Sequence, residues 1–113
     1  MTRKASGLKA WALQRVTAIY IGVFALYLLF ALMFDNPSSY PAWIQWFAHP
    51  IMGIATLVFI VSILLHAWVG VRDVIIDYIK PIAIRAPLLA LIALSLLACA
   101  LWASQSLILV RLI

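Results

Sequence analysis

Three apolar runs determine what this chain can fold into. They extend over residues 16–34, 51–79 and 87–110, and short segments rich in turn-forming or charged residues separate them. An α-helix rises about 1.5 Å per residue, so about 20 apolar residues cross the hydrocarbon core of a membrane. Each run approaches or exceeds that length. The sequence therefore predicts an all-α integral membrane protein with three transmembrane helices.

The composition excludes an ordinary soluble domain. Mean hydropathy is +1.19, 68% of the residues are apolar and only 10% are charged. With 113 residues, the chain has room for three helices and short connections, so we expect one membrane-anchor domain over residues 1–113. The sequence pI of about 9.9 does not indicate nucleic-acid binding, because the basic residues lie at the ends of the apolar runs. The lone Cys99 excludes an internal disulfide and is interpreted as a small packing residue.

Turn formers and prolines set the expected ends of the helices. The first run stops at a cluster of turn formers, residues 35–39. Pro50 suits the first turn of the second helix, and Pro81 disfavours helical structure at Lys80. The basic N-terminus before the first run resembles a signal peptide. Because that run is long and no small-x-small cleavage site follows it, we interpret it as an uncleaved signal anchor.

The distribution of basic residues predicts an orientation. Seven of the eight lie in the N-terminal segment or around the second connection: Arg3, Lys4, Lys9, Arg15, Arg72, Lys80 and Arg85. The first connection has none, and the C-terminus has only Arg111. The positive-inside rule then places the N-terminus in the cytoplasm and the C-terminus in the periplasm.

The first connection is rich in aromatic residues. Tyr40, Trp43, Trp46 and Phe47 are interpreted there as a membrane-interface belt. His49, next to Pro50, is interpreted as a solvated or capping histidine. On the first run, the small residues at positions 18 and 22 indicate close helix packing within a bundle.

His66 lies inside the second apolar run. An ionisable side chain at that depth is costly, so it usually binds something. A neutral imidazole in a dry helical bundle is suited to hold a metal, and haem iron is the usual one. One histidine fills only one axial position, so the second position is open or belongs to another chain. The alternative is a hydrogen-bonded polar residue with no ligand.

The second helix carries a polar face. At about 100° per residue, His66, Gly70, Asp73 and Asp77 fall within about 60° of arc. Gly70 either leaves room for a flat macrocycle or is a notch for helix packing. Asp73 and Asp77 either belong to a site or form a solvated helix end.

Other residues near this face have candidate roles if a cofactor is present. Arg15 or Arg72 could supply a cation for a haem propionate. Tyr78 could donate a hydrogen bond to a quinone carbonyl, or it could be an interfacial aromatic residue. Asp77 beside it could orient a basic partner or take part in proton delivery. The residues alone leave these alternatives open.

Three segments resemble a known family. Residues 62–70 read SILLHAWVG, residues 77–81 read DYIKP, and residues 15–19 read RVTAI. Together they resemble the smaller, D-type hydrophobic membrane anchor of bacterial succinate:quinone oxidoreductase, respiratory complex II. The expected topology of three helices with the N-terminus inside is similar over essentially the whole chain.

The resemblance implies roles for four residues. His66 would be an axial ligand of haem b, and a sister membrane subunit of the cytochrome b556 type would supply the second histidine. Tyr78 would donate a hydrogen bond to ubiquinone, and Asp77 would neighbour that site. Arg15 is a candidate contact for a haem propionate.

The resemblance also implies partners, a pathway and a location. A flavoprotein and an iron–sulfur subunit would oxidise succinate, a step of the tricarboxylic acid cycle, and this chain would be non-catalytic alone. The expected location is a bacterial inner membrane, in contact with lipid. Two alternatives stay open: an anchor of a quinol:fumarate reductase, and a non-redox membrane scaffold.

Overall fold

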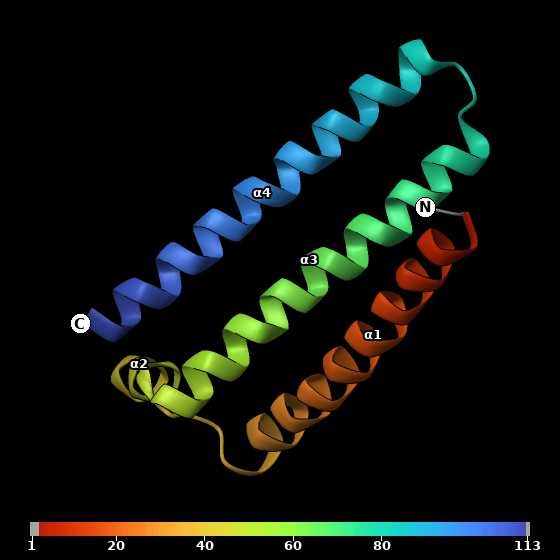
Figure 1. The fold of residues 1–113 in the computed structure, drawn as a ribbon. Coiled ribbons are helices and arrows are strands. Elements are labelled where there is room, and N and C mark those ends of the chain that lie inside the picture. Colours follow the sequence, from red (N-terminus) through yellow and green to blue (C-terminus); the bar gives the residue numbers. More distant parts are fainter. Residues whose placement is uncertain (1–2, 113) are drawn as a thin grey trace.

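The computed structural model describes residues 3–112, which fold into four α-helices without a strand in that range. They are α1 (Arg3–Phe34), α2 (Tyr40–Ala48), α3 (Pro50–Tyr78) and α4 (Ile82–Leu112) (Figure 1). Three of them, α1, α3 and α4, contain segments long and apolar enough to cross a membrane. The predicted all-α fold with three spans is confirmed. Residues 1, 2 and 113 of the expected domain, and the side chains of Arg3 and Lys4, lie outside what the structure describes.

The three long helices form a single layer with α3 in the middle (Figure 1). Helix α3 contacts α1 on one side and α4 on the other, whereas α1 and α4 do not contact each other within the described residues. The short helix α2 packs across one end of the layer, against α3 and α4. The molecule is elongated, with extents of 51 × 25 × 24 Å. Only α3 therefore has long helices on two sides.

The contact between α1 and α3 contains aromatic packing and a hydrogen bond. The ring of Phe24, 6% exposed, lies 4.7 Å from the ring of Phe59 between centroids. One turn away, the hydroxyl of Tyr20 donates to the backbone carbonyl of Ala55 at 2.7 Å. These interactions fix how α1 lies against α3.

The sequence does not predict helix α2, because its aromatic residues are typical of an interfacial belt in a connection. The Ser39 hydroxyl caps it by accepting from the backbone N–H of Ala42 at 3.3 Å, and Pro41 occupies the first turn. On this helix Trp43, Trp46 and Phe47 pack on one another, with centroids between 5.3 and 6.1 Å apart. The aromatic cluster therefore lies on a short helix that crosses the end of the layer.

His49 links α2 to α3, and the capping interpretation is confirmed. Its Nδ1 accepts from the backbone N–H of Ile51 at 3.2 Å, while its own backbone N–H bonds back to the last turn of α2. A second link joins the start of α4 to the end of α3. The guanidinium of Arg85 donates to the carbonyl oxygens of Ile79 and Lys80, at 3.1 and 3.0 Å, where α3 ends.

Two helices begin earlier than predicted. Helix α1 begins at Arg3 rather than near Val16, because a helix continues through polar residues that hydropathy does not count as membrane. Helix α4 begins at Ile82 rather than at Pro87, which lies inside it. A proline costs little near a helix start, where few N–H groups have partners, and here the carbonyl of Pro81 starts the helix by accepting from residues 84 and 85.

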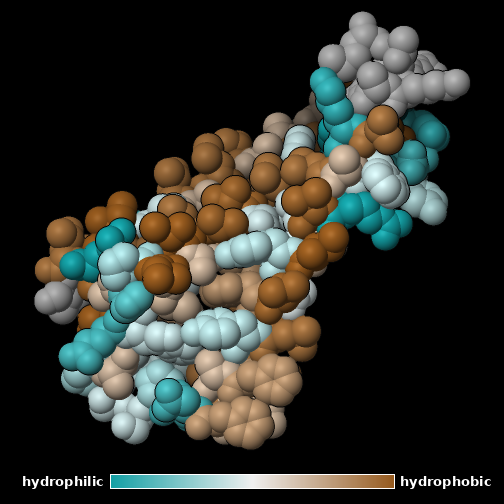
Figure 2. Space-filling model, turned by 60° about the horizontal axis from the view of Figure 1, so that its bottom comes forward, coloured by the Kyte–Doolittle hydropathy of each residue, from teal (hydrophilic) through white to brown (hydrophobic). Residues whose placement is uncertain are grey.

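The layer leaves large apolar surfaces open. No residue of α4 is buried, and exposed large hydrophobic side chains occur along all three long helices. Figure 2 shows hydrophobic residues over much of one view, with hydrophilic residues gathered toward the ends. Gly22 on α1 is exposed, and a Cβ added to it would meet nothing within 4 Å. The close packing expected at Ala18 and Gly22 is therefore not made by the described part of this chain.

Candidate functional site

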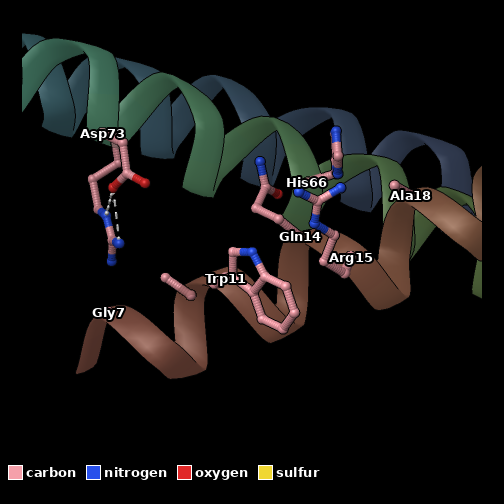
Figure 3. Close-up of a pocket in the computed structure, with 9 residues that line it drawn as sticks. Gly7, Trp11, Gln14, Arg15, Ala18, His66 and Asp73 are labelled. Carbon is pink, nitrogen blue, oxygen red and sulfur yellow. Dashed lines mark hydrogen bonds and ion pairs between the residues drawn. The ribbon is translucent and has the colours of Figure 1, made fainter. Parts of the chain in front are cut away.

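A pocket of about 450 Å³ opens between α1 and α3 (Figure 3). It lies along the first half of α1 and the second half of α3. Its lining residues are Gly7, Ala10, Trp11, Gln14, Arg15 and Ala18 from α1, and His66, Arg72 and Asp73 from α3. The antiparallel arrangement of the two helices thus brings His66 and Arg15, 51 positions apart in the sequence, to one pocket.

The imidazole of His66 contacts α1 through one nitrogen. Its Nδ1 lies 3.1 Å from Oγ1 of Thr17, which is only 5% exposed. The other nitrogen, Nε2, makes no hydrogen bond to the residues that the structure describes. His66 itself is half-buried. One ring nitrogen is therefore held by the protein, and the other is available to a ligand.

The two candidate cations differ in their surroundings. Arg72 forms an ion pair with the neighbouring Asp73 at 3.1 Å, and both side chains are partly exposed. The guanidinium of Arg15 lies over the indole ring of Trp11, 5.5 Å from its centroid, and no carboxylate of residues 3–112 lies within ion-pair distance. Arg15 is thus the cation better placed to bind an anionic group in this pocket.

Gln14 is a pocket residue that sequence reasoning missed. A Cβ added to Gly70 would lie 3.5 Å from Nε2 of Gln14, an ordinary packing distance. The space beside Gly70 is therefore taken by this side chain, which favours a packing notch over a gap for a macrocycle. The Oε1 atom of Gln14 is buried and has no hydrogen-bond partner in the described chain. Nothing in the sequence marks this amide as a pocket residue, because it lies just before the first apolar run.

Asp77 and Tyr78 lie away from the pocket, in the last turn of α3. They follow His66 by eleven and twelve positions, which corresponds to about 17 Å of helical rise. Both are exposed, and Tyr78 is 81% exposed. The structure therefore does not bring the four predicted residues into one site. His66 and Arg15 share the pocket, while Asp77 and Tyr78 form a separate surface at the end of the helix.

The pocket can supply one side of a metal or cofactor site. Within residues 3–112, no group of three or more His, Cys, Asp or Glu side chains could hold a metal ion. A haem needs only one imidazole from each axial side and cations near its carboxylates. An imidazole with a free nitrogen, an unpaired guanidinium and an open pocket fit that requirement.

Comparison with known proteins identifies the class. Residues 1–102 match the family described as succinate dehydrogenase/fumarate reductase transmembrane subunit. The chain belongs to this family. A hydrophobic membrane anchor subunit of succinate dehydrogenase from Coxiella burnetii is 40% identical over 105 residues, which cover 93% of this chain and 91% of that protein.

More distant relatives carry the same name. The hydrophobic membrane anchor subunits of succinate dehydrogenase from Rickettsia bellii and Rickettsia conorii are 34% and 31% identical over 89 and 90 residues. The matches cover 79% of this chain and 71% of each relative. The predicted family is confirmed, as is the interpretation as a non-catalytic, multi-pass subunit of a bacterial inner membrane.

Proposed function

We propose that this chain anchors a succinate:quinone oxidoreductase, supplies one axial ligand of a haem b and forms part of a ubiquinone site. The observation that carries the proposal is the pocket between α1 and α3, which His66 and Arg15 line in a chain of the succinate dehydrogenase/fumarate reductase transmembrane subunit family. The haem, when bound, supplies one-electron redox chemistry. The chain's own residues bind and orient it.

His66 is the proposed axial ligand. Its free Nε2 can coordinate iron, while Thr17 on α1 holds the opposite edge of the ring. A half-buried imidazole at this depth has little water to compete for its lone pair. Among the described residues that line the pocket, His66 is the one histidine, so a second membrane subunit of the cytochrome b556 type would fill the other axial position.

Arg15 is the proposed contact for a haem propionate. Asp73 in the pocket lining is paired with Arg72, so a ligand carboxylate would find the Arg15 guanidinium without an ion-pair partner among residues 3–112. Stacking on Trp11 limits the freedom of the guanidinium. A guanidinium binds a carboxylate with two parallel hydrogen bonds, so this position favours arginine over lysine.

Tyr78 and Asp77 are the proposed contribution to the ubiquinone site. The exposed phenol of Tyr78 can donate a hydrogen bond to a quinone carbonyl at the end of α3. Asp77 can orient a basic residue of a partner or hold a proton beside that carbonyl. This surface is separate from the pocket of His66, which suits two electron acceptors at different depths.

The proposed complex contains three partners. A flavoprotein and an iron–sulfur subunit would oxidise succinate on the cytoplasmic face, where the positive-inside rule predicts the N-terminus and the connection between α3 and α4. The second membrane subunit would cover part of the open layer. The family description names fumarate reductase as well, so the reverse reaction, quinol-dependent fumarate reduction, is the second candidate.

The test is the visible spectrum of the complex purified through a tag on this chain. We expect His66→Ala to abolish or shift the b-type absorbance, because it removes one of two axial ligands. His49→Ala is the matched control, since His49 caps α3 at the opposite end and should leave the spectrum unchanged. An assembled His66→Ala complex with the normal spectrum would falsify the ligand assignment.

A further inference from the structure

The hydroxyl of Thr17 has three neighbours and only one proton. Its Oγ1 lies 2.7 Å from the carbonyl oxygen of Leu13, 3.2 Å from that of Gln14 and 3.1 Å from Nδ1 of His66. The shortest of these distances is typical of an O–H···O bond. In a helix, a threonine hydroxyl commonly donates to the carbonyl four residues earlier. The Thr17 hydroxyl therefore donates its proton in a hydrogen bond to the carbonyl oxygen of Leu13.

That assignment determines the proton on His66. With its proton directed to Leu13, Oγ1 presents a lone pair to Nδ1, so a favourable contact at 3.1 Å requires Nδ1–H as the donor. A neutral imidazole carries one N–H, so Nε2 is then unprotonated. Thr17 is 5% exposed, and little water can replace it at this nitrogen.

We propose that Thr17 is a positioning residue that fixes His66 as the Nδ1–H tautomer and sets the orientation of its ring. This inference rests on the proposed role of His66 as a haem ligand. Histidine ligands commonly donate their second N–H to an acceptor, which fixes the tautomer and makes the ligating nitrogen more basic. Here the acceptor is on another helix, so the contact between α1 and α3 also positions the ligand.

The Thr17 hydroxyl should lower the reduction potential of the haem. An acceptor on Nδ1–H increases electron donation from the ring, which favours ferric over ferrous iron. Removing the hydroxyl should raise the potential. It should also weaken haem binding, because a buried N–H loses its partner.

The experiment compares three variants of the purified complex. Thr17→Val removes the hydroxyl at nearly constant volume, and Thr17→Ser keeps it. Thr56→Val is the matched control, because the Thr56 hydroxyl is buried on α3 and has no partner in the described chain. Haem content is measured by absorbance after dilution in detergent. The midpoint potential is measured by optical redox titration.

We expect Thr17→Val to lower haem affinity about tenfold, the lower end of the usual effect of such partners. If the loss falls on the ferric form alone, the potential rises by about 59 mV. Thr17→Ser and Thr56→Val should match the wild type. If Thr17→Val does not assemble, Thr17→Ala removes the same hydroxyl without added bulk, and the same shift is expected.

Failure of the Thr17 role and failure of the His66 ligand role would give different results. Normal haem content and potential in an assembled complex lacking the Thr17 hydroxyl would overturn this inference, even with His66 as ligand. A shift of equal size in Thr17→Ser would also overturn it, since the hydroxyl is still present. A normal spectrum in His66→Ala would instead remove the ligand assignment on which both proposals depend.

Discussion

His66 and Tyr78 lie on one helix but in different surroundings. His66 is half-buried against Thr17, whereas Tyr78 is 81% exposed in the last turn. The two side chains are separated by about 17 Å of helical rise. Because they share no pocket or hydrogen bond, a change at one should leave the other intact. Their proposed roles in haem binding and quinone binding can therefore be tested separately.

Tyr78→Phe tests the quinone role. It removes one hydroxyl from an exposed ring, and loss of a hydrogen bond worth about 1 kcal/mol lowers quinone reduction about fivefold. Succinate oxidation by an artificial soluble acceptor should be unchanged, as should the haem spectrum. Tyr40→Phe, at the opposite end of the molecule and 73% exposed, is the control. Equal losses with both acceptors would indicate an assembly defect instead.

At this scale the sequence identifies residues better than contacts. His66 is conspicuous because an ionisable group inside an apolar run is costly. The amide of Gln14 and the hydroxyl of Thr17 give no such signal near the polar start of a membrane helix. The contact between Thr17 and His66 spans 49 positions and depends on how α1 is rotated and shifted against α3. Hydropathy does not contain that register.

Among the elements, α1 and α3 form the pair that builds the pocket. Membrane helices gain little from the hydrophobic effect on association, so packing and interhelical hydrogen bonds hold them together. Here the Phe24–Phe59 contact and the bond from Tyr20 to Ala55 lie between Thr17 and the end of α1 nearest to α2. They fix the register on which the Thr17–His66 contact depends.

Tyr20→Phe tests this element. Loss of the 2.7 Å bond to the Ala55 carbonyl should lower the free energy of unfolding by roughly 0.6 to 2 kcal/mol, the range for hydrogen bonds between membrane helices. Thermal denaturation of the complex in detergent measures this change in stability. Tyr27→Phe is the matched control, because the Tyr27 hydroxyl makes no hydrogen bond within residues 3–112. Identical stabilities of the two variants would contradict a role for this bond.

Hydropathy predicts the spans but not the full helices. The apolar length of a run reports where hydrocarbon begins and ends, whereas a helix continues as long as its backbone bonds are favourable. Helix α1 therefore extends back to Arg3, and α4 passes through Pro87. Helix α2 has only nine residues, and its start resembles a turn because Pro37, Ser38 and Ser39 precede it and Pro41 lies in its first turn.

In the whole molecule, the single layer leaves the pocket open and much of each long helix uncovered. Lipid can cover apolar side chains, but it cannot supply a second axial ligand. If His66 ligates a haem as proposed, a partner chain would therefore approach the side of α1 on which Ala18 lines the pocket. Gly22 lies four residues further on the same side of α1 and has open space beyond it. Small residues let a neighbouring helix approach closely, so this side suits a helix of the second membrane subunit.

Gly22→Phe tests this arrangement. A ring at this position would keep a partner helix away, and a loss of about 1 kcal/mol in packing would lower association about fivefold. Co-purification of the second membrane subunit and haem content should fall together. The control is Ala98→Phe, at an exposed position of α4, a helix that the pocket does not involve. If Gly22→Phe retains normal amounts of subunit and haem while Ala98→Phe loses them, the second subunit binds α4, and the His66 pocket must be completed from another direction.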